Sequence, residues 1–217
     1  MTQHRVFVTG ATGYIASALI PALIARGHGV RALVRRGSWR ALHAGALAIH
    51  GNALDAASYR DAIRPADTFV HLVGTPHPRP TKAQQFIDVD LVSIHAALDA
   101  AVHAGVRHFI YVSVAHPAPV MADYIAVRKQ GEVLVRQSGL PATIVRPWYV
   151  LGPGHYWPLA LAPFYGVLER IPATREFATR LGLVTIDEMT AALVNAVEDP
   201  PEELRVLNVP DIRGTAI

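Results

Sequence analysis

Three side chains in the middle of the chain have the types and spacing needed for proton transfer: Ser113, Tyr124 and Arg128. Ser113 ends an apolar run that predicts a strand over 107–113, and ligands gather at the carboxyl ends of strands in open α/β sheets. Tyr124 and Arg128 lie four residues apart in a predicted helix over 123–138, so both occupy one helical face. A cation beside a tyrosine favours the phenolate, which suits acid–base catalysis near neutral pH.

Two of these residues also have simpler interpretations. Arg128 can form an i,i+4 ion pair with Glu132, and Tyr124 can be an ordinary half-buried helix tyrosine. Lys129 lies about 100° further round the helix and cannot face the same way as Tyr124. The sequence leaves both alternatives open.

The N-terminal segment has the pattern of a dinucleotide-binding turn. Val6 to Val8 predict a buried strand, and the following apolar run predicts a helix over 13–26. Gly10 lets the chain leave the strand in a conformation closed to side chains, and Gly13 lets backbone N–H groups approach a pyrophosphate. Ala16 allows the helix to pack close to the sheet, so the helix N-terminus faces the phosphates.

Apolar runs alternate with helical periodicity along the rest of the chain, which is typical of a doubly wound parallel sheet. The predicted strands are 5–9, 30–34, 47–50, 68–73, 107–113, 142–146 and 205–209. The predicted helices are 13–26, 38–44, 58–63, 83–104, 123–138 and 187–198. A Gly- and Pro-rich segment over 152–166 predicts a loop or short helices. We therefore expect an α/β fold with a single domain over 1–217, onto which a reduced substrate-side lobe packs over about 148–183.

Two motifs resemble those of a known superfamily. The residues from Thr9 to Ala16 read Thr-Gly-Ala-Thr-Gly-Tyr-Ile-Ala and resemble the nucleotide motif of extended and atypical short-chain dehydrogenases/reductases. Residues 146–154 resemble the Arg-Pro-x-x-x-x-Gly-Pro segment that lines the nicotinamide end in that superfamily. The resemblance covers roughly residues 5–210. It implies an NAD(P)-binding Rossmann fold similar to that of nucleoside-diphosphate-sugar epimerases.

The catalytic candidates resemble the Ser and Tyr-x-x-x-Lys set of the same superfamily. The resemblance implies that Ser113 holds the substrate oxygen and that Tyr124 transfers a proton. The residue at position 128 would bind the nicotinamide ribose and lower the pKa of the tyrosine. Arg128 stands where the family has lysine, and it keeps the charge but cannot lose its proton to a relay. Whether the site is active is therefore open.

The end of the second predicted strand indicates which nucleotide is preferred. NAD-preferring Rossmann enzymes place an acid there for the ribose hydroxyls, whereas this chain has Arg35 and Arg36. A guanidinium pairs well with a 2′-phosphate, so NADP(H) is the predicted cofactor. The complete predicted cofactor set is Gly10, Thr12, Gly13, Tyr14, Ile15, Arg35, Arg36, Asn52, Ala53, Leu54, Val73, Gly74, Thr75, Ser113, Tyr124, Arg128, Pro147, Tyr149 and Val150.

The composition limits the other classes of function. The chain has 217 residues, no cysteine and a formal charge of +3, with scattered basic residues, so we expect no nucleic-acid partner. Its apolar runs are too short for a membrane span. The eleven histidines form no metal-binding pattern, and we expect no metal site. A cytoplasmic protein is the simplest expectation, and the sequence does not indicate an oligomeric state.

These observations favour an NADPH-dependent reductase acting on a small apolar carbonyl or quinone-like acceptor. Trp148, Tyr149, Tyr156 and Trp157 predict an aromatic-lined substrate pocket, although they can equally be packing residues. The alternative is a non-catalytic NADP(H)-binding redox sensor or assembly factor, which the arginine at position 128 favours. A sugar-nucleotide epimerase is a weaker alternative, because the C-terminal lobe is short. The substrate itself cannot be named from the sequence.

Overall fold

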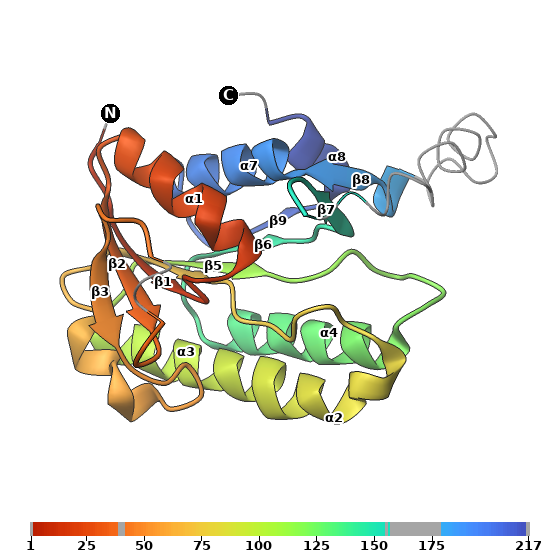
Figure 1. Cartoon of the computed structure of the whole chain (residues 1–217), viewed down its shortest axis with the longest axis horizontal. Coiled ribbons are helices and arrows are strands. Elements are labelled where there is room, and N and C mark those ends of the chain that lie inside the picture. The colour runs from red at the N-terminus through yellow and green to blue at the C-terminus, as the bar shows by residue number, and fades with distance from the viewer. Residues whose placement is uncertain (1, 39–41, 155, 157–178, 216–217) are drawn as a thin grey trace.

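A seven-stranded parallel sheet forms the centre of the computed structural model (Figure 1), which describes residues 2–38, 42–154, 156 and 179–215. The strand order is β3-β2-β1-β4-β5-β6-β9, so the chain reverses its direction of travel across the sheet between β1 and β4. The strands are β1 Arg5–Thr9, β2 Gly29–Val34, β3 Leu47–His50, β4 Thr68–His71, β5 His108–Val112, β6 Ala142–Val145 and β9 Leu204–Leu207. The predicted doubly wound sheet is thereby confirmed, with each strand within two residues of its expected ends.

Helices cover both faces of this sheet (Figure 1). One face carries α1 Tyr14–Ala25, α7 Ile186–Glu198 and α8 Val209–Arg213. The opposite face carries α2 Ala83–Gln85, the π-helical turn η5 Phe86–Leu91, α3 Val92–Ala104 and α4 Ala122–Gln137. In the described part of the chain, three short 3₁₀ turns lie in the connections: η2 Ala56–Ser58, η3 Arg60–Ala62 and η4 Pro80–Lys82.

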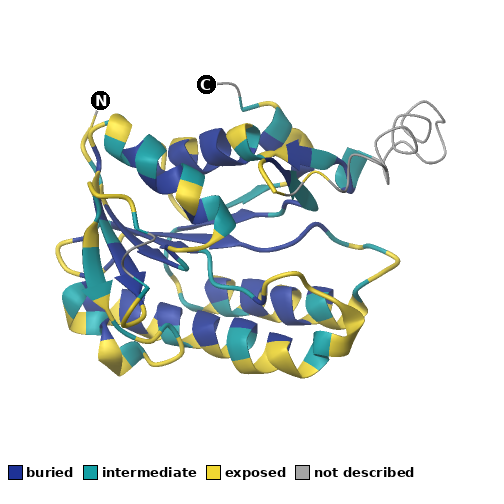
Figure 2. Ribbon diagram, in the orientation of Figure 1, coloured by how far each residue is buried: buried dark blue, intermediate teal, exposed yellow. Residues whose placement is uncertain are grey.

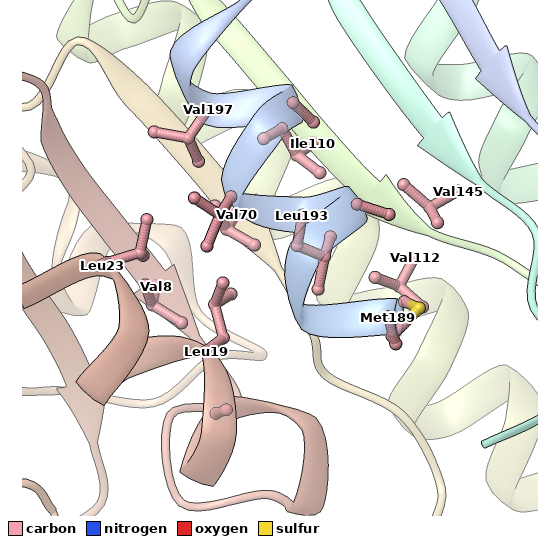
Figure 3. Close-up of a cluster of buried hydrophobic side chains, with 14 of the residues drawn as sticks. Val8, Leu19, Leu23, Val70, Ile110, Val112, Val145, Met189, Leu193 and Val197 are labelled. Atoms are coloured by element: carbon pink, nitrogen blue, oxygen red, sulfur yellow. The ribbon is translucent and has the colours of Figure 1, made fainter. Parts of the chain in front are cut away.

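The period-two alternation of strand side chains divides the interior into two apolar clusters, one on each face of the sheet. Figure 2 shows that buried residues occupy the strands and the inner faces of the helices. The cluster under α1 and α7 is drawn in Figure 3. Its labelled members include Val8, Leu19, Val70, Ile110 and Leu193. Both faces of the sheet are therefore buried, as the near-continuous apolar strands require.

An aromatic row supports the opposite face. Phe7, Phe69 and Phe109 come from the adjacent strands β1, β4 and β5, and all three are fully buried. Their ring centroids lie 5.2 Å and 5.1 Å apart, within the range in which aromatic pairs stabilise each other. The row fixes the three strands whose carboxyl ends carry the functional residues.

Two predicted helices are wrong in detail. The helix expected over 58–63 is instead η2 and η3, because so short a segment gains too few hydrogen bonds for α-helix nucleation. The helix expected over 38–44 is not found at 38 or at 42–44, where a bend leads into a turn, and 39–41 lie outside the described residues. The long helix expected over 83–104 is present, but η5 interrupts it with a π-helical turn.

The C-terminal region divides differently from the predicted lobe. Two strands that were not predicted, β7 Tyr149–Leu151 and β8 Leu183–Thr185, pair in parallel as a small separate sheet. Residues 155 and 157–178, with Trp157 and most of the predicted loop, lie outside the described residues. After β8, a capping box of Thr185 and Glu188 starts α7, which returns to pack beside α1. The lobe over 148–183 remains a prediction.

Candidate functional site

The turn after β1 has the geometry predicted for a phosphate-binding loop. Gly10 has φ +70°, and a Cβ there would lie 2.7–2.9 Å from backbone atoms of Leu72 and Val73. The carboxyl end of β4 therefore packs directly against the turn, which leaves no room for a side chain. Gly13 donates its N–H to the carbonyl of Gly10 at 2.9 Å and closes the turn.

The N-terminus of α1 is open to an anion. Gly13 is its N-cap residue, so no side chain caps the helix, and its first turn contains no acidic residue. The free N–H groups and the helix dipole at Tyr14 and Ile15 can therefore attract an anion such as a phosphate. A dinucleotide pyrophosphate fits this position because it needs backbone donors rather than a side-chain cation.

A cavity of about 590 Å³ lies over the carboxyl ends of β1, β2, β3 and β4. We call it the adenosine-side cavity. The predicted cofactor residues that line it are Gly10, Thr12, Gly13, Arg35, Asn52, Ala53, Leu54, Val73 and Gly74. No Asp or Glu is among the described residues that line it.

The edge of this cavity carries the residues expected at the adenine and its ribose. Arg35 lines the cavity and is exposed, whereas Arg36 is exposed outside it. The side-chain oxygen of Asn52 accepts the N–H of Leu54 at 3.1 Å, which holds the loop after β3. Leu54 is 38% exposed, so its side chain is available to an aromatic ring.

A second cavity of about 550 Å³, here called the substrate-side cavity, adjoins the first, and Leu72 lines both. The loops after β4 and β5 leave the sheet on the same side, at the right in Figure 1. The predicted site residues that line this cavity are Tyr14, Ile15, Ser113, Tyr124, Arg128, Pro147, Tyr149 and Val150. Of the complete predicted set, Arg36 and Thr75 alone line neither cavity.

Arg128 is buried between three elements, with 6% of its surface exposed. One of its guanidinium nitrogens, Nη2, forms an ion pair with Asp90 Oδ1 at 2.6 Å, and Nη1 donates to the carbonyl of Val112 at 3.1 Å. A Cβ at Gly74 would overlap with the guanidinium, so this glycine allows the close approach. Both terminal nitrogens of Arg128 therefore contact protein groups.

The alternative ion pair between Arg128 and Glu132 is wrong: within the described part of the chain, Arg128 pairs with Asp90 and Glu132 pairs with Arg146. Burial alone would lower the pKa of Arg128, but Tyr124 and the buried Asp90 help to hold it above its ordinary value. The residue is thus a permanent cation whose charge Asp90 balances.

Sequence reasoning missed Asp90. Its carboxylate is 2% exposed and accepts two further hydrogen bonds at Oδ2, from the Thr75 N–H at 2.9 Å and the Thr75 hydroxyl at 2.6 Å. Thr75 therefore serves the loop rather than the cavity wall. The only sequence signal was an acid within the apolar helical pattern of 83–104, and the π-helical turn η5 contains it.

Tyr124 lies over the guanidinium of Arg128, with 5.2 Å from Cζ to the ring centroid. The ring of the buried Phe86 packs against it at 5.1 Å between centroids. Tyr124 is half-buried and lines the substrate-side cavity. The ring of Tyr111 also lies near the guanidinium, with 5.9 Å from Cζ to its centroid. Burial raises the pKa of Tyr111 to about 12, so that phenol stays protonated.

Ser113 is also buried, and its hydroxyl donates to Glu132 Oε1 at 2.7 Å. Arg146 binds both oxygens of the same carboxylate, and His116 lies 3.3 Å from Oε1. Burial favours the neutral carboxyl, but hydrogen bonds from Arg146 and Ser113 outweigh it and hold the pKa of Glu132 below its ordinary value. The serine hydroxyl is therefore oriented by the carboxylate that the sequence offered as an alternative partner for Arg128.

His71 lies at the end of β4 beneath the site. Its ring nitrogens contact the hydroxyls of Thr9 at 2.9 Å and Ser93 at 3.3 Å. Burial, together with the charge of Arg128, lowers the pKa of His71 to about 3. The ring is therefore neutral and joins β1, β4 and α3 by hydrogen bonds.

The described residues lack the features of two other classes of site. No three His, Asp or Glu side chains gather there as a metal ion would require. None of the helices in that part of the chain is long and apolar enough to cross a bilayer.

Comparison with known proteins identifies the family. A family model described as NAD(P)H-binding matches residues 10–153. Ceramide reductase of Caulobacter vibrioides is 28% identical over 96% of this chain and 65% of its own length. Sterol demethylase protein B of Methylococcus capsulatus is 32% identical over 70% of this chain and 53% of its own. A farnesyl-dihydroquinoline-oxide ketoreductase of Stigmatella aurantiaca is 30% identical over 68% and 51%. The chain thus spans between about half and two thirds of these curated relatives.

Solved structures share the fold. The enzyme WbmH of Bordetella bronchiseptica, in complex with NAD+, superposes with a TM-score of 0.70 at 22% identity, covering 94% of this chain and 75% of that one. UDP-glucose 4-epimerase of Thermotoga maritima, with UDP-glucose, gives 0.70 at 18% identity, covering 98% and 84%. At such identities the likeness establishes the fold alone. The family match over 10–153 shows that the chain belongs to the NAD(P)H-binding family, and the solved structures share its Rossmann-like α/β fold.

Proposed function

We propose that the protein is an NADPH-dependent reductase that acts on a small apolar carbonyl or quinone-like acceptor. The observation that carries the proposal is the position of Tyr124. Its phenol lies in the wall of the substrate-side cavity, which adjoins the adenosine-side cavity. Two of the curated relatives are named as reductases, one of a ceramide and one of a farnesylated quinoline oxide. Both names describe substrates with large apolar parts.

The preference for NADP(H) rests on Arg35. This residue lines the adenosine-side cavity at the end of β2, where no acid lines the described wall. An arginine–phosphate contact is a strong charge-assisted hydrogen bond, whereas a guanidinium offers no acceptor to ribose hydroxyls. Arg35→Ala should lose about tenfold to a hundredfold in affinity for NADPH and little for NADH.

Calorimetry with both nucleotides tests this preference. Arg36→Ala is the matched control, because Arg36 is its exposed neighbour outside the cavity and should leave both affinities unchanged. Equal affinities of the parent protein for the two nucleotides would contradict the NADP(H) assignment.

When bound, the nicotinamide supplies the hydride, and the protein must supply a proton to the substrate oxygen. We assign this proton to Tyr124. Ser113 is the neighbouring candidate, but its proton is already donated to Glu132, so its Oγ faces a ligand as an acceptor. Arg128 keeps a positive charge behind the ring of Tyr124 and cannot take part in proton transfer.

Loss of NADPH absorbance with a panel of aryl ketones and quinones tests the reaction. Tyr124→Phe should lower turnover by about a hundredfold to ten-thousandfold, since general acid catalysis is lost, while NADPH affinity stays within about twofold. Turnover at the parent rate in this variant would exclude Tyr124 as the proton donor.

A non-catalytic NADP(H)-binding protein is the second candidate, and the surroundings of Arg128 favour it. Both terminal nitrogens of Arg128 contact Asp90 or backbone carbonyls, so little of this cation remains for a ribose or a phenolate. Tight NADPH binding without oxidation by any panel member would support this candidate over the reductase.

A further inference from the structure

The substrate-side cavity combines an apolar wall with an excess of positive charge. Trp148, Tyr149 and Val150 form one part of its wall, and no Asp or Glu is among the described residues that line it. Its two permanent cations are Arg79 and Arg128. Arg128 is neutralised by Asp90, which leaves Arg79 as the uncompensated cation of the described lining.

Arg79 is exposed; its carbonyl accepts the N–H of Lys82 at 2.9 Å, but its guanidinium forms no hydrogen bond or ion pair within the described part of the chain. Most exposed arginines point into bulk water, but this one borders a cavity that also contains the predicted proton donor. A guanidinium presents five N–H donors in a planar fork, the shape that carboxylates and phosphates match.

The loop that carries Arg79 is held on both sides of it. Thr75 is tied to the buried carboxylate of Asp90 by two hydrogen bonds. Further along, the ammonium of Lys82 donates to the carbonyl of Pro76 at 2.6 Å. These contacts place Arg79 at the rim of the cavity without using its guanidinium.

We propose that Arg79 binds the anionic group, a carboxylate or a phosphate, of a substrate whose apolar body occupies the substrate-side cavity. The inference deepens the proposed function, on which it rests, by adding an anionic end to the apolar acceptor. Arg79 is then a specificity-determining residue, and it lies apart from the nucleotide-binding turn.

Binding of amphiphiles that cannot be reduced tests this without turnover. Calorimetry of the full chain saturated with NADPH compares three probes below their micelle concentrations: dodecanoate, dodecyl phosphate and the neutral dodecanol. We expect Arg79→Gln to weaken the better-bound anion about fivefold to tenfold and to leave dodecanol unchanged. The two anions distinguish a carboxylate from a phosphate.

Two further variants sharpen the test. Arg79→Glu should weaken the anions more than Arg79→Gln and should improve binding of dodecyltrimethylammonium. Arg107→Gln is the matched control and should leave every affinity unchanged. Arg107 is an exposed arginine just before the amino end of β5, whereas the cavity lies beyond the carboxyl end of that strand.

Three results would overturn the inference: equal loss of dodecanol and anions in Arg79→Gln, no preference of the parent protein for either anion over dodecanol, or weaker NADPH binding in Arg79→Gln. The last would assign Arg79 to the cofactor. Failure of the reductase proposal looks different, because it would leave the probe affinities intact and remove only turnover.

Discussion

The buried ion pair between Asp90 and Arg128 makes a quantitative prediction about stability. Asp90→Asn leaves the Arg128 charge buried with only backbone carbonyls as partners, and losing one partner of a buried pair costs about 3–5 kcal/mol. Arg128→Met leaves the Asp90 carboxylate with only the two hydrogen bonds from Thr75, at a cost of about 3 kcal/mol.

The double variant removes both charges together, so its cost should fall well short of the sum of the two. We expect a coupling free energy of about 2–3 kcal/mol. The exposed pair of Arg205 and Asp199, 3.0 Å apart, is the control and should give a coupling of about 1 kcal/mol or less. Urea unfolding followed by circular dichroism measures all the variants.

Additive costs at Asp90 and Arg128 would refute the argument, since they would mean that water or another group already compensates each charge. A coupling equal to that of the exposed control would have the same meaning. A large coupling would confirm that the cation at position 128 is neutralised before any ligand binds.

Three other predictions follow from the turn after β1 and from the buried histidines. Gly13→Val should abolish NADPH binding while the protein stays folded. The fold should tolerate the change because a Cβ at Gly13 would approach only the carbonyl of Gly10, at 3.0 Å. Calorimetry measures the binding and circular dichroism checks the fold. Gly10→Ala should instead lower the melting temperature, since its Cβ meets the backbone at 2.7 Å and its φ is positive. The free energy of unfolding should fall as pH drops from 6.5 to 4.5. Burial lowers the pKa of His71 to about 3 and that of His108 to about 4, so both rings stay neutral in the folded protein over this range. The same histidines take up protons in the unfolded chain, which favours unfolding. His71→Gln should flatten that dependence. Hydrogen bonds from Arg26 and His28 lower the pKa of Glu198 to about 2. The stability that Glu198 contributes is therefore lost mainly below this pH range.

Local pattern was sufficient to predict the sheet and the position of the glycine turn between β1 and α1. β1 begins and ends where the sequence placed it, because a buried parallel strand is a continuous apolar run bounded by turn residues. β3 also has its predicted ends, although it is an edge strand with no buried residue. Gly10 and Gly13 could be assigned because the spacing of small residues is itself the geometric requirement. The small strands β7 and β8 were missed, since three-residue strands carry no periodicity.

The partners of the predicted catalytic residues could not be derived in this way. The i,i+4 rule favours Glu132 for Arg128, and in an isolated helix that pair would form. In the fold, Arg146 at the end of β6 takes the carboxylate of Glu132, and Asp90 reaches Arg128 from a helix that lies 38 residues earlier. Such contacts depend on which strand ends lie side by side, and no local spacing contains that information.

The arginine at position 128 acquires a definite meaning from these contacts. A lysine ammonium is a compact point charge that can be shared with a ribose, whereas this guanidinium spans Asp90 and two strand-end carbonyls. The residue therefore fixes the backbone at Val73 and Gly74, where the two cavities meet, and contributes little net charge to Tyr124. If the protein is a reductase, its tyrosine works mainly as a neutral acid that donates a proton. Loss of Asp90 should then alter turnover as well as the stability, because Asp90 holds the cation behind this tyrosine in place.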